Sequence, residues 1–476
     1  MFNSKYEIVV GLETHAELST KTKIYCGCKN EFGAEVNTNC CPVCMALPGS
    51  MPSLNKMVVE YAVMMGHALN CDINLVSTKD RKNYFYPDLP KGYQVSQVNL
   101  PICGNGYIDL LVNGETKRIG INQLHIEEDT AKLIHEENAT LVDFNRAMVP
   151  LIEIVSAPDF RSLAEVEAYL DNIKAILEYL NISDAKMQEG SIRCDVNVSV
   201  NEIGAKEFGE RVEIKNVASF SGALRAIEYE ANRHIEILDN GGKIESETRR
   251  WDDLKGESIS MRGKAANDYL VFADPDFLPI VLDESYVNDL KSKIPTLPNE
   301  RVIKYVNDYK IAEKEAKILA NSKTRSDFFE ECVSIGNATP KAIVNWIIGD
   351  ISKILNDGKF TLSDLSAQSV AEMVQAIEGG KISNTAGKTV IDELFATDKT
   401  VAEIIAEKGL EQNNDTSALE KIVEDVLAAN PQTIEQYKAG KTNVLGFLVG
   451  QCMKASRGTG NPQILNDMIA EKLSGN

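Results

Sequence analysis

Polar and apolar residues alternate in a segment that starts at Tyr6, and a period of two is typical of a β-strand with one buried face. Ile8, Val10 and Leu12 fall on one side of this strand, whereas Glu13, His15 and Glu17 fall on the other. Two carboxylates and an imidazole are therefore expected on one face. The alternative is that this face is only the solvated side of an antiparallel strand.

Four later segments carry oxygen ligands in a similar arrangement. Asn122, Leu124, Ile126 and Glu128 alternate with Gln123, His125 and Glu127; Glu153 stands in the apolar run Leu151–Val155; Asp195, Asn197 and Ser199 alternate with valines; Glu213 and Lys215 alternate with Val212 and Ile214. If these strands share one sheet, its polar face could hold Mg²⁺ with substrate phosphates, because Mg²⁺ prefers oxygen ligands.

Basic residues near these segments could contact phosphates, or they could equally be surface or paired residues; they are Arg81, Lys82, Arg193, Lys215, Arg249 and Arg250. The chain contains neither a Walker A sequence nor a Gly-x-Gly-x-x-Gly fingerprint. A phosphate site in this protein is therefore not a P-loop.

Strand-like segments mixed with a few helices extend from residue 5 to about residue 290, and only helical patterns follow Pro295 and Pro298. Ser162 and Glu165 predict a capping box at the start of one helix. We therefore expect an α+β fold: a large, mostly antiparallel-sheet domain with flanking helices (1–292), an all-helical domain (293–405) and a small helical tail domain (406–476).

Four cysteines have a spacing that suits tetrahedral zinc: Cys26-x-Cys28, twelve residues, then Cys41-Pro-Val-Cys44. A closed four-thiolate site would hold a loop together and would not catalyse. The alternatives are reduced cysteines in a turn-rich loop, and Cys40 in place of Cys41 as the third ligand.

The net charge of −20 excludes a protein that coats nucleic acid non-specifically. Residues 431–476 are instead slightly basic, which indicates a local phosphate contact or simply solvated charges. No apolar run approaches the roughly 18–20 residues that span a bilayer, and the start of the chain shows no leader pattern. We therefore expect a soluble, cytoplasmic protein.

Together these segments resemble the B subunit of the tRNA-dependent amidotransferases, which convert glutamate on misacylated tRNA(Gln), or aspartate on tRNA(Asn), to the amide. The motifs that carry the resemblance span nearly the whole chain: Val10–Leu18, Arg81–Asp88, Tyr93–Gln97, His125–Asp129, Asp143–Arg146, Pro150–Pro158, Glu189–Asn197, Glu213–Asn216, Glu247–Arg250 and Gly446–Gln451. Between Lys264 and Ala273 the chain departs from the family pattern, because an arginine and a proline are missing and the loop is one residue shorter.

The resemblance implies a cradle domain with an ATP-dependent kinase-like site, a helical domain and a tail domain. It also implies a heterotrimer with a glutaminase, the A subunit, that supplies ammonia through a channel, and with a small C subunit. An acyl phosphate would form on the aminoacyl carboxylate and ammonia would displace the phosphate. The alternative function is a zinc-stapled tRNA-binding scaffold without ATP chemistry of its own.

The site residues expected on this basis fall into four groups. The catalytic group is Glu13, His15, Lys82, Glu128, Glu153, Asp195 and Asn197, of which His15, Glu128 and Glu153 would hold Mg²⁺. Arg193, Lys215 and Arg249 would contact the nucleotide. Cys26, Cys28, Cys41 and Cys44 would hold a structural Zn²⁺, and Lys438, Lys441, Lys454 and Arg457 would contact tRNA.

Overall fold

The structure, a computed structural model, describes residues 5–263, 269–412, 416–438, 444–456 and 460–474. The chain divides into two compact units, Met1–Tyr305 with Ala320–Lys323, and Val306–Leu319 with Thr324–Asn476. The three-domain division stays a prediction. The described residues contain no helix long and apolar enough to cross a membrane.

The described strands all lie in the first unit: β1 (Tyr6–Glu17), β2 (Asp72–Ile73), β3 (Val76–Ser77), β4 (Asp80–Asn83), β5 (Tyr93–Ser96), β6 (Cys103–Val112), β7 (Glu115–Glu128), β8 (Lys132–His135), β9 (Thr140–Asp143), β10 (Pro150–Ser156), β11 (Ile192–Glu202), β12 (Val212–Lys215), β13 (Glu247–Asp252), β14 (Glu257–Gly263), β15 (Leu270–Ala273) and β16 (Ile280–Val281). Its helices are α1 (Lys56–Ala68), α2 (Leu163–Tyr179), α3 (Phe220–Asp239) and α4 (Glu284–Ser292), and α5 (Pro298–Asn307) crosses its boundary.

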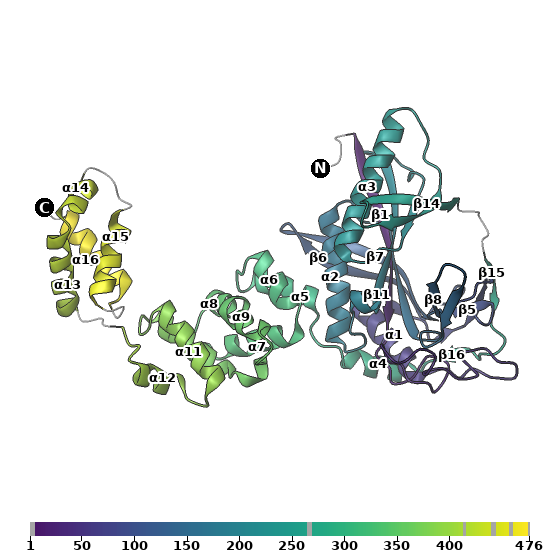
Figure 1. Cartoon of the computed structure of the whole chain (residues 1–476), viewed down its shortest axis with the longest axis horizontal. Coiled ribbons are helices and arrows are strands. Elements are labelled where there is room, and N and C mark those ends of the chain that lie inside the picture. Colours follow the sequence, from purple (N-terminus) through teal and green to yellow (C-terminus); the bar gives the residue numbers. More distant parts are fainter. Residues whose placement is uncertain (1–4, 264–268, 413–415, 439–443, 457–459, 475–476) are drawn as a thin grey trace. The chain divides into compact units, whose positions relative to one another are not determined.

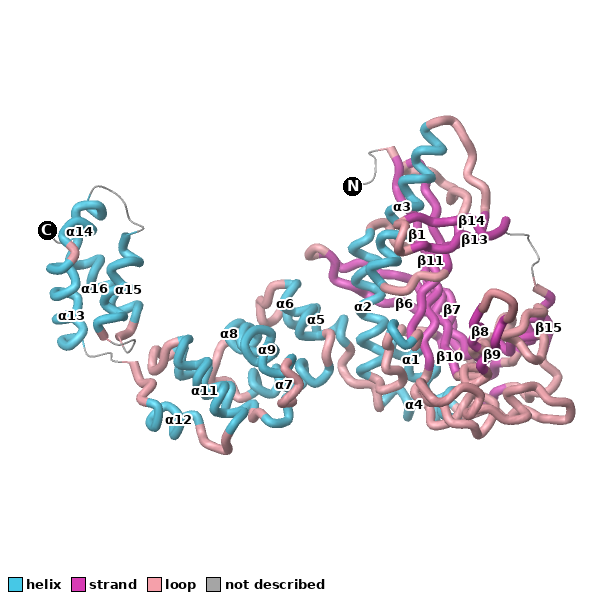
Figure 2. Tube along the Cα trace, viewed as in Figure 1, coloured by secondary structure: helices cyan, strands magenta, loops and turns pink. Residues whose placement is uncertain are grey.

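A nine-stranded sheet runs through the first unit in the order β14-β13-β12-β11-β1-β10-β7-β6-β2 (Figures 1 and 2). Neighbouring strands are antiparallel except β12 and β13, which are parallel. The expected α+β fold with a mostly antiparallel sheet is therefore confirmed. Strand β1 lies in the middle of the sheet, and both of its edges are hydrogen-bonded.

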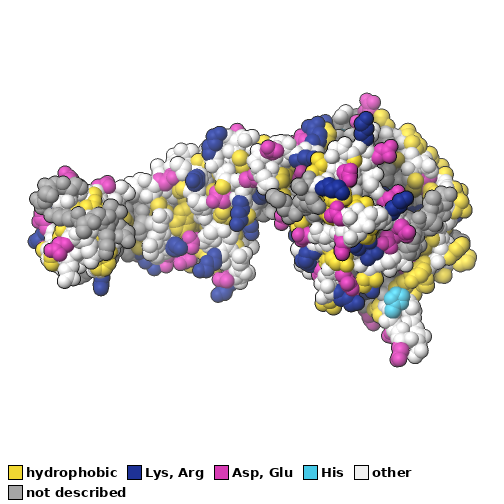
Figure 3. Space-filling model, turned by 90° about the horizontal axis from the view of Figure 1, so that it is seen from above, with side chains coloured by type: hydrophobic (Ala, Val, Ile, Leu, Met, Phe, Trp, Pro, Cys, Tyr) yellow, Lys and Arg dark blue, Asp and Glu magenta, His cyan; other side chains and the backbone are white. Residues whose placement is uncertain are grey.

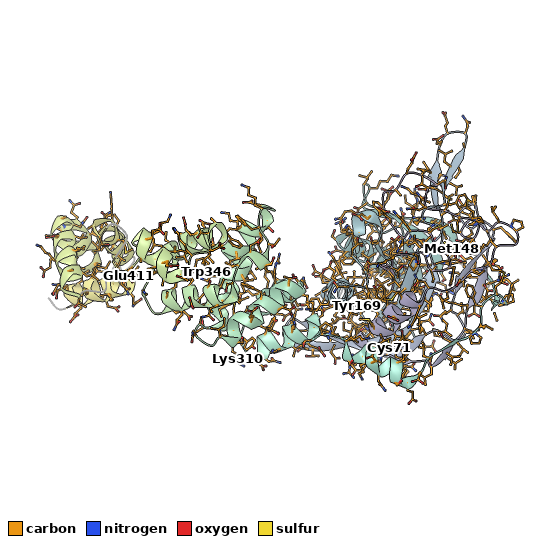
Figure 4. All side chains as sticks on the ribbon, turned by 90° about the horizontal axis from the view of Figure 1, so that it is seen from below. Cys71, Met148, Tyr169, Lys310, Trp346 and Glu411 are labelled. Carbon is orange, nitrogen blue, oxygen red and sulfur yellow. The ribbon has the colours of Figure 1, made fainter. Side chains whose placement is uncertain are left out.

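One face of this sheet is covered by α1, α2 and α3, which contact β7, β6 and β11 respectively. Ile8, Val10 and Leu12 of β1 are buried in the resulting core. Figure 4 labels two of the other residues in this unit's packed interior, Tyr169 of α2 and Cys71. The alternation predicted for β1 thus places its apolar side chains on this packed face and its polar side chains on the opposite face.

Helix α2 begins where the sequence predicted, at a side-chain cap. The hydroxyl of Ser162 accepts a hydrogen bond from the Glu165 amide, at 3.3 Å. The Glu165 carboxylate accepts from the amide of Arg161, at 2.6 Å, one residue before the expected partner. The predicted capping box is therefore present in its first half and shifted in its second.

Smaller sheets adjoin the large one: β15-β4-β5, β16-β3 and the β8-β9 hairpin. The strands β4, β5 and β15 are short, and β5 contacts β7. Hydrophobic side chains gather at the end of the first unit that carries β5 and β15 (Figures 1 and 3). Among the large exposed apolar residues are Phe85, Leu270 and Leu278. This end therefore has an apolar surface.

The second unit is built from helices: α6 (Glu313–Ala320), α7 (Lys323–Ser334), α8 (Pro340–Trp346), α9 (Ser352–Asn356), α10 (Ala367–Glu378), α11 (Asn384–Ala396), α12 (Val401–Lys408), α13 (Thr416–Ala429), α14 (Pro431–Lys438), α15 (Val444–Ala455) and α16 (Pro462–Ser474). One side of α13 is apolar for a structural reason. Leu419 and Val423 pack with Leu448 and Cys452 of α15, and with Ile469 of α16, in a separate small core.

Candidate active site

The polar face of the sheet gathers the side chains that the alternation predicted. His15 of β1 lies opposite Glu153 of β10 and opposite Arg193 of β11. Glu13 lies opposite Asp195 of β11 in the same register. The strands therefore share one sheet, and titratable groups from several of them meet on its polar face.

The first cluster on this face consists of His15, Glu127 and Glu153. Each residue offers one ligand atom, and these atoms lie within 4.8 Å of one another. The His15 Nε2 is 3.6 Å from Glu127 and 3.5 Å from Glu153, too far for good hydrogen bonds. Three groups that could ligate a cation thus converge on one point, and His15 is also within ion-pair distance of both carboxylates.

His125 supports this cluster from β7, where it lies opposite Glu153. Its Nε2 is 3.1 Å from the Glu153 carboxylate and 3.7 Å from Glu127. Burial would lower the pKa of both imidazoles, but the carboxylates of Glu153 and Glu127 outweigh it and raise the pKa of His15 and of His125 to about 9. The two histidines in turn hold the pKa of Glu153 well below its usual range, despite its burial.

Glu128 does not belong to this cluster, and its role as a magnesium ligand stays a prediction. Its carboxylate is bound 2.6 Å from the Nζ of Lys91 and accepts from the amide of Val95 at 2.8 Å. Because side chains alternate along β7, Glu128 shares the face of buried Leu124 and Ile126. Glu127 takes the place that was predicted for Glu128.

A second cluster lies beside the first and is formed by Glu13, Asp195 and Glu213, again with ligand atoms within 4.8 Å. The Nζ of Lys215 stands 2.7 Å from Asp195 and 3.1 Å from Glu213, so a lysine already compensates this negative charge. Asn197 donates to Glu13 at 3.0 Å. Burial, followed by repulsion from Glu153, raises the pKa of Glu13.

A cavity of about 570 Å³ opens beside these clusters, and His15, Glu127, Arg193, Asp195 and Lys215 line it. The Arg193 guanidinium is 2.8 Å from Asp129, which makes it a fixed cation. The His15, Glu127 and Glu153 cluster and two basic side chains therefore face one hollow. Such an arrangement suits a polyanionic substrate held together with a metal ion.

Arg249 faces away from the polar face of the sheet, and its contact with the nucleotide stays a prediction. It pairs in register with buried Ile214, so it faces the helices. Its guanidinium donates to the Ser258 hydroxyl at 2.8 Å and to Glu247 at 2.6 Å, and its Nε is 3.5 Å from Glu230 of α3. Arg249 thus holds β13 and β14 against α3.

Lys82 lies in β4 of the three-stranded sheet rather than on the polar face of the large one. Its Nζ stands 5.0 Å from the centre of the Tyr269 ring. That ring is 5.5 Å from the ring of Tyr84, which lines the 570 Å³ cavity. Lys82 is therefore next to a wall of the cavity.

The four predicted cysteines come together, with the Sγ atoms of Cys26, Cys28, Cys41 and Cys44 within 4.8 Å. Cys40 turns away, because its Sγ donates to the carbonyl oxygen of Asn37 at 3.1 Å. Cys41 and not Cys40 therefore belongs to the cluster. Hydrogen bonding from Cys26 lowers the pKa of Cys44 to about 5, although burial opposes this.

Of the basic residues predicted to contact tRNA, Lys454 is exposed on α15 and Lys438 ends α14. Lys441 and Arg457 lie outside the described residues. The departure from the family pattern also falls partly on residues 264–268, outside the described part of the chain; the strand after it, β15, pairs with β4.

Sequence reasoning missed two members of the site, His125 and Glu127. The signal was present, because both alternate with Leu124 and Ile126, whose apolar side chains mark the packed face. The alternation places His125 and Glu127 on the polar face together with Gln123, and Glu128 on the other.

Comparison with known proteins shows the family to which this chain belongs. Residues 8–288 match the family described as the GatB/GatE catalytic domain, and residues 327–473 match the family described as the GatB domain. The chain is 50% identical over 477 residues to the B subunit of the aspartyl/glutamyl-tRNA(Asn/Gln) amidotransferase of Caldicellulosiruptor bescii, covering 98% of this chain and 99% of that protein.

Two further relatives carry the same description. The protein of Clostridium tetani is 50% identical over 473 residues, with 98% of this chain and 99% of the relative covered. That of Thermoanaerobacter sp. strain X514 is 48% identical over 474 residues, with 99% and 100% covered. The chain therefore belongs to the family of B subunits of the aspartyl/glutamyl-tRNA(Asn/Gln) amidotransferases.

Proposed function

We infer that this chain is the component in which ATP activates the side-chain carboxylate of glutamate on tRNA(Gln), of aspartate on tRNA(Asn), or of both. The observation that carries this inference is the His15, Glu127 and Glu153 cluster, which opens on a cavity also lined by Arg193 and Lys215. Membership of the family supports the choice of reaction. The intact cluster argues against a scaffold without ATP chemistry.

The residues of the cluster fit Mg²⁺ as the metal. Glu127 and Glu153 supply the hard carboxylate oxygens that Mg²⁺ prefers, and His15 adds a third ligand. Three protein ligands leave positions open for phosphate oxygens. When bound, the metal would neutralise charge on the phosphates of ATP. His125 would orient the two carboxylates through its Nε2.

The reaction needs two displacements. A carboxylate oxygen of the aminoacyl group attacks the γ-phosphorus of ATP, the bond to ADP breaks, and an acyl phosphate forms. Ammonia then attacks the acyl carbon, the C–O bond to phosphate breaks, and the nitrogen loses a proton. Arg193 and Lys215 face the cavity where phosphate charge would lie, and the pairing of Lys215 with Asp195 and Glu213 keeps it protonated.

Ammonia would come from a glutaminase, the A subunit, with a small C subunit completing a heterotrimer in the cytoplasm. The apolar surface at the β5 and β15 end supports a partner there, because monomeric proteins rarely expose large contiguous apolar patches. Phe85 is 94% exposed and Leu278 is 88% exposed. Both side chains would lose contact with water in such a complex.

A structural Zn²⁺ would occupy the cysteine cluster, since four thiolates at a turn match its preferred tetrahedral site. It would tie together the loop that follows β1. The tail region would contact tRNA through its basic residues, of which Lys454 is exposed.

Reconstituted heterotrimer tests this function with each misacylated tRNA, glutamine and ATP. The wild-type complex should form amidated aminoacyl-tRNA and ADP, and Glu153→Gln should lower that rate about a thousandfold through the loss of one metal ligand. Glutamine hydrolysis by the glutaminase should persist in the variant. ADP formation that ignores misacylated tRNA, or full amidation by Glu153→Gln, would overturn the inference.

A further inference from the structure

Glu17 lies on the polar face of β1, and the proposed function gives it no role. It follows His15 by two positions, so its side chain leaves the same face of the strand about 7 Å farther along. Glu17 lines a second cavity, of about 310 Å³. Asp129 lines the larger cavity and Arg146 the smaller, and the two charged groups are 3.6 Å apart. The two cavities therefore share a wall.

The half-buried Glu17 carboxylate takes part in no hydrogen bond or ion pair with the described residues. Two arginines act on its charge, but both are bonded elsewhere. The Arg193 guanidinium is 2.8 Å from Asp129, and that of Arg146 donates to the carbonyl oxygen of Thr130 at 2.9 Å. A half-buried carboxylate without a partner favours a ligand that brings a cation with N–H donors.

The smaller cavity is acidic as a whole. Four carboxylates and only two cations line it: Glu17, Glu31, Asp143 and Glu189 against Lys132 and Arg146. The other three acids have partners. Asp143 accepts from the Asn145 amide at 3.0 Å. Glu189 is 3.1 Å from Lys186, and Glu31 is 3.9 Å from Lys29. Glu17 is therefore the acid of this cavity that is available to a cationic ligand.

We propose that Glu17 binds the α-ammonium group of the aminoacyl residue on tRNA. Resting on the proposed function, the substrate carries two charged groups there, the side-chain carboxylate that reacts and the α-ammonium group that does not. In an extended glutamyl group they are about 5 Å apart by standard bond lengths. Because Glu17 and His15 are about 7 Å apart along β1, one glutamyl group can bond to Glu17 and still place its carboxylate at the His15 cluster.

An ammonium group has a second source in this reaction, since free ammonium ion is in equilibrium with the ammonia that displaces phosphate. The two sources make different predictions. A site for the α-ammonium group selects among aminoacyl-tRNAs and ignores the nitrogen donor. A site for ammonium ion does the reverse.

Steady-state amidation by the full heterotrimer tests the proposal with glutamyl-tRNA(Gln) and with glutaryl-tRNA(Gln), which lacks only the amino group. If the complex amidates only aspartyl-tRNA(Asn), succinyl-tRNA(Asn) is the matching substrate. Wild type should prefer the aminoacyl form by about 10–100-fold in kcat/KM, the usual effect of a hydrogen bond between charged groups. Glu17→Gln should remove most of this preference by slowing the aminoacyl form alone, and Glu17→Asp should restore part of it.

Both substrates are measured on one preparation, so a loss of folded protein lowers both rates and leaves their ratio unchanged. Glu7→Gln is the matched control, because Glu7 is a carboxylate at the other end of the same strand and lies 3.8 Å from Arg161. This variant should keep the full preference of wild type. A preference that Glu17→Gln retains, or that wild type lacks, would overturn the α-ammonium site alone.

Ammonium chloride in place of glutamine distinguishes the two sources. With the α-ammonium group at Glu17, the KM for ammonium should be the same in wild type and Glu17→Gln. If Glu17→Gln instead raises this KM equally with both tRNA substrates, the cavity holds ammonium ion and the assignment is wrong. Wild-type complex that amidates neither aminoacyl-tRNA would overturn the proposed function instead.

Discussion

Substitution of two adjacent glutamates separates a metal ligand from a structural ion pair. Glu127→Gln removes one anionic ligand from the cluster with His15 and Glu153. Changes to residues that only orient a metal ligand typically cost about 10–100-fold in metal affinity, so loss of a ligand itself should weaken Mn²⁺ binding by at least about a hundredfold. The fold should be affected less than by the loss of a buried Lys–Glu pair, because Gln retains the size of Glu and Glu153 still faces both His15 and His125. We therefore expect weak metal binding and a near-normal melting temperature.

Glu128→Gln should instead lower the melting temperature and leave metal binding intact. The Glu128 side chain is 2% exposed and its partner Lys91 is 12% exposed, with 2.6 Å between the charged atoms. Removing one partner of such a buried pair leaves the other charge uncompensated and costs about 3–5 kcal/mol. The melting temperature should therefore fall by several degrees while Mn²⁺ still binds.

The assays are calorimetric unfolding and Mn²⁺ titration followed by electron paramagnetic resonance. Glu115→Gln, at an exposed position of the same strand β7, is the control and should leave both quantities unchanged. The reasoning fails if Glu128→Gln loses Mn²⁺ at an unchanged melting temperature while Glu127→Gln keeps it.

Three other properties can be tested directly. Elemental analysis should find one zinc per chain, and Cys28→Ser should lose it while Cys40→Ser keeps it; protein without zinc would contradict the site. Burial would raise the pKa of Glu230, but hydrogen bonds from His234, Arg233 and Ser258 lower it from 4.5 to about 2. The ionised Glu230 carboxylate should stabilise the fold by roughly 3 kcal/mol, completely above pH 4.5 and no longer as the pH falls toward 2. Glu230→Gln should therefore flatten that part of the plot of urea-unfolding free energy against pH. An unchanged plot would refute the prediction. Truncation near residue 406 should weaken tRNA binding but spare ATP binding and assembly. Each neutralised contact, such as Lys454, should lower the slope of log affinity against log salt concentration by roughly 0.7–0.9. Unchanged tRNA affinity across a salt series would count against the tail as the tRNA contact.

The sequence predicted the polar face of the sheet well because alternation is a local property. Glu13 and His15 follow from Ile8, Val10 and Leu12 without knowledge of any neighbouring strand. That several such strands join one sheet was an inference from their shared chemistry. The registers of β1 with β10 and β11 confirm it.

Two predicted site residues lie away from the polar face, each beside a residue of like charge that stands on the opposite face. Glu127 and Glu128 differ by one position, and the choice depended on reading the apolar partners Leu124 and Ile126 as the packed side. The side on which Arg249 lies is harder to predict, because it depends on the parallel pairing of β13 with β12. On that side Arg249 meets Glu230 of helix α3. That partner lies 19 residues away in the sequence, and no local pattern indicates it.

Strand β1 has a consequence for how this protein can change during evolution or engineering. Both of its edges are paired, so its backbone is held in a fixed register. Gly11, Glu13 and His15 therefore lie on the polar face at two-residue intervals. Inserting or deleting a single residue before Gly11 would turn Gly11, Glu13 and His15 toward the packed helices together. Length variation is therefore excluded from this strand. New specificity has to be introduced in the loops around it, or by exchanging side chains one for one.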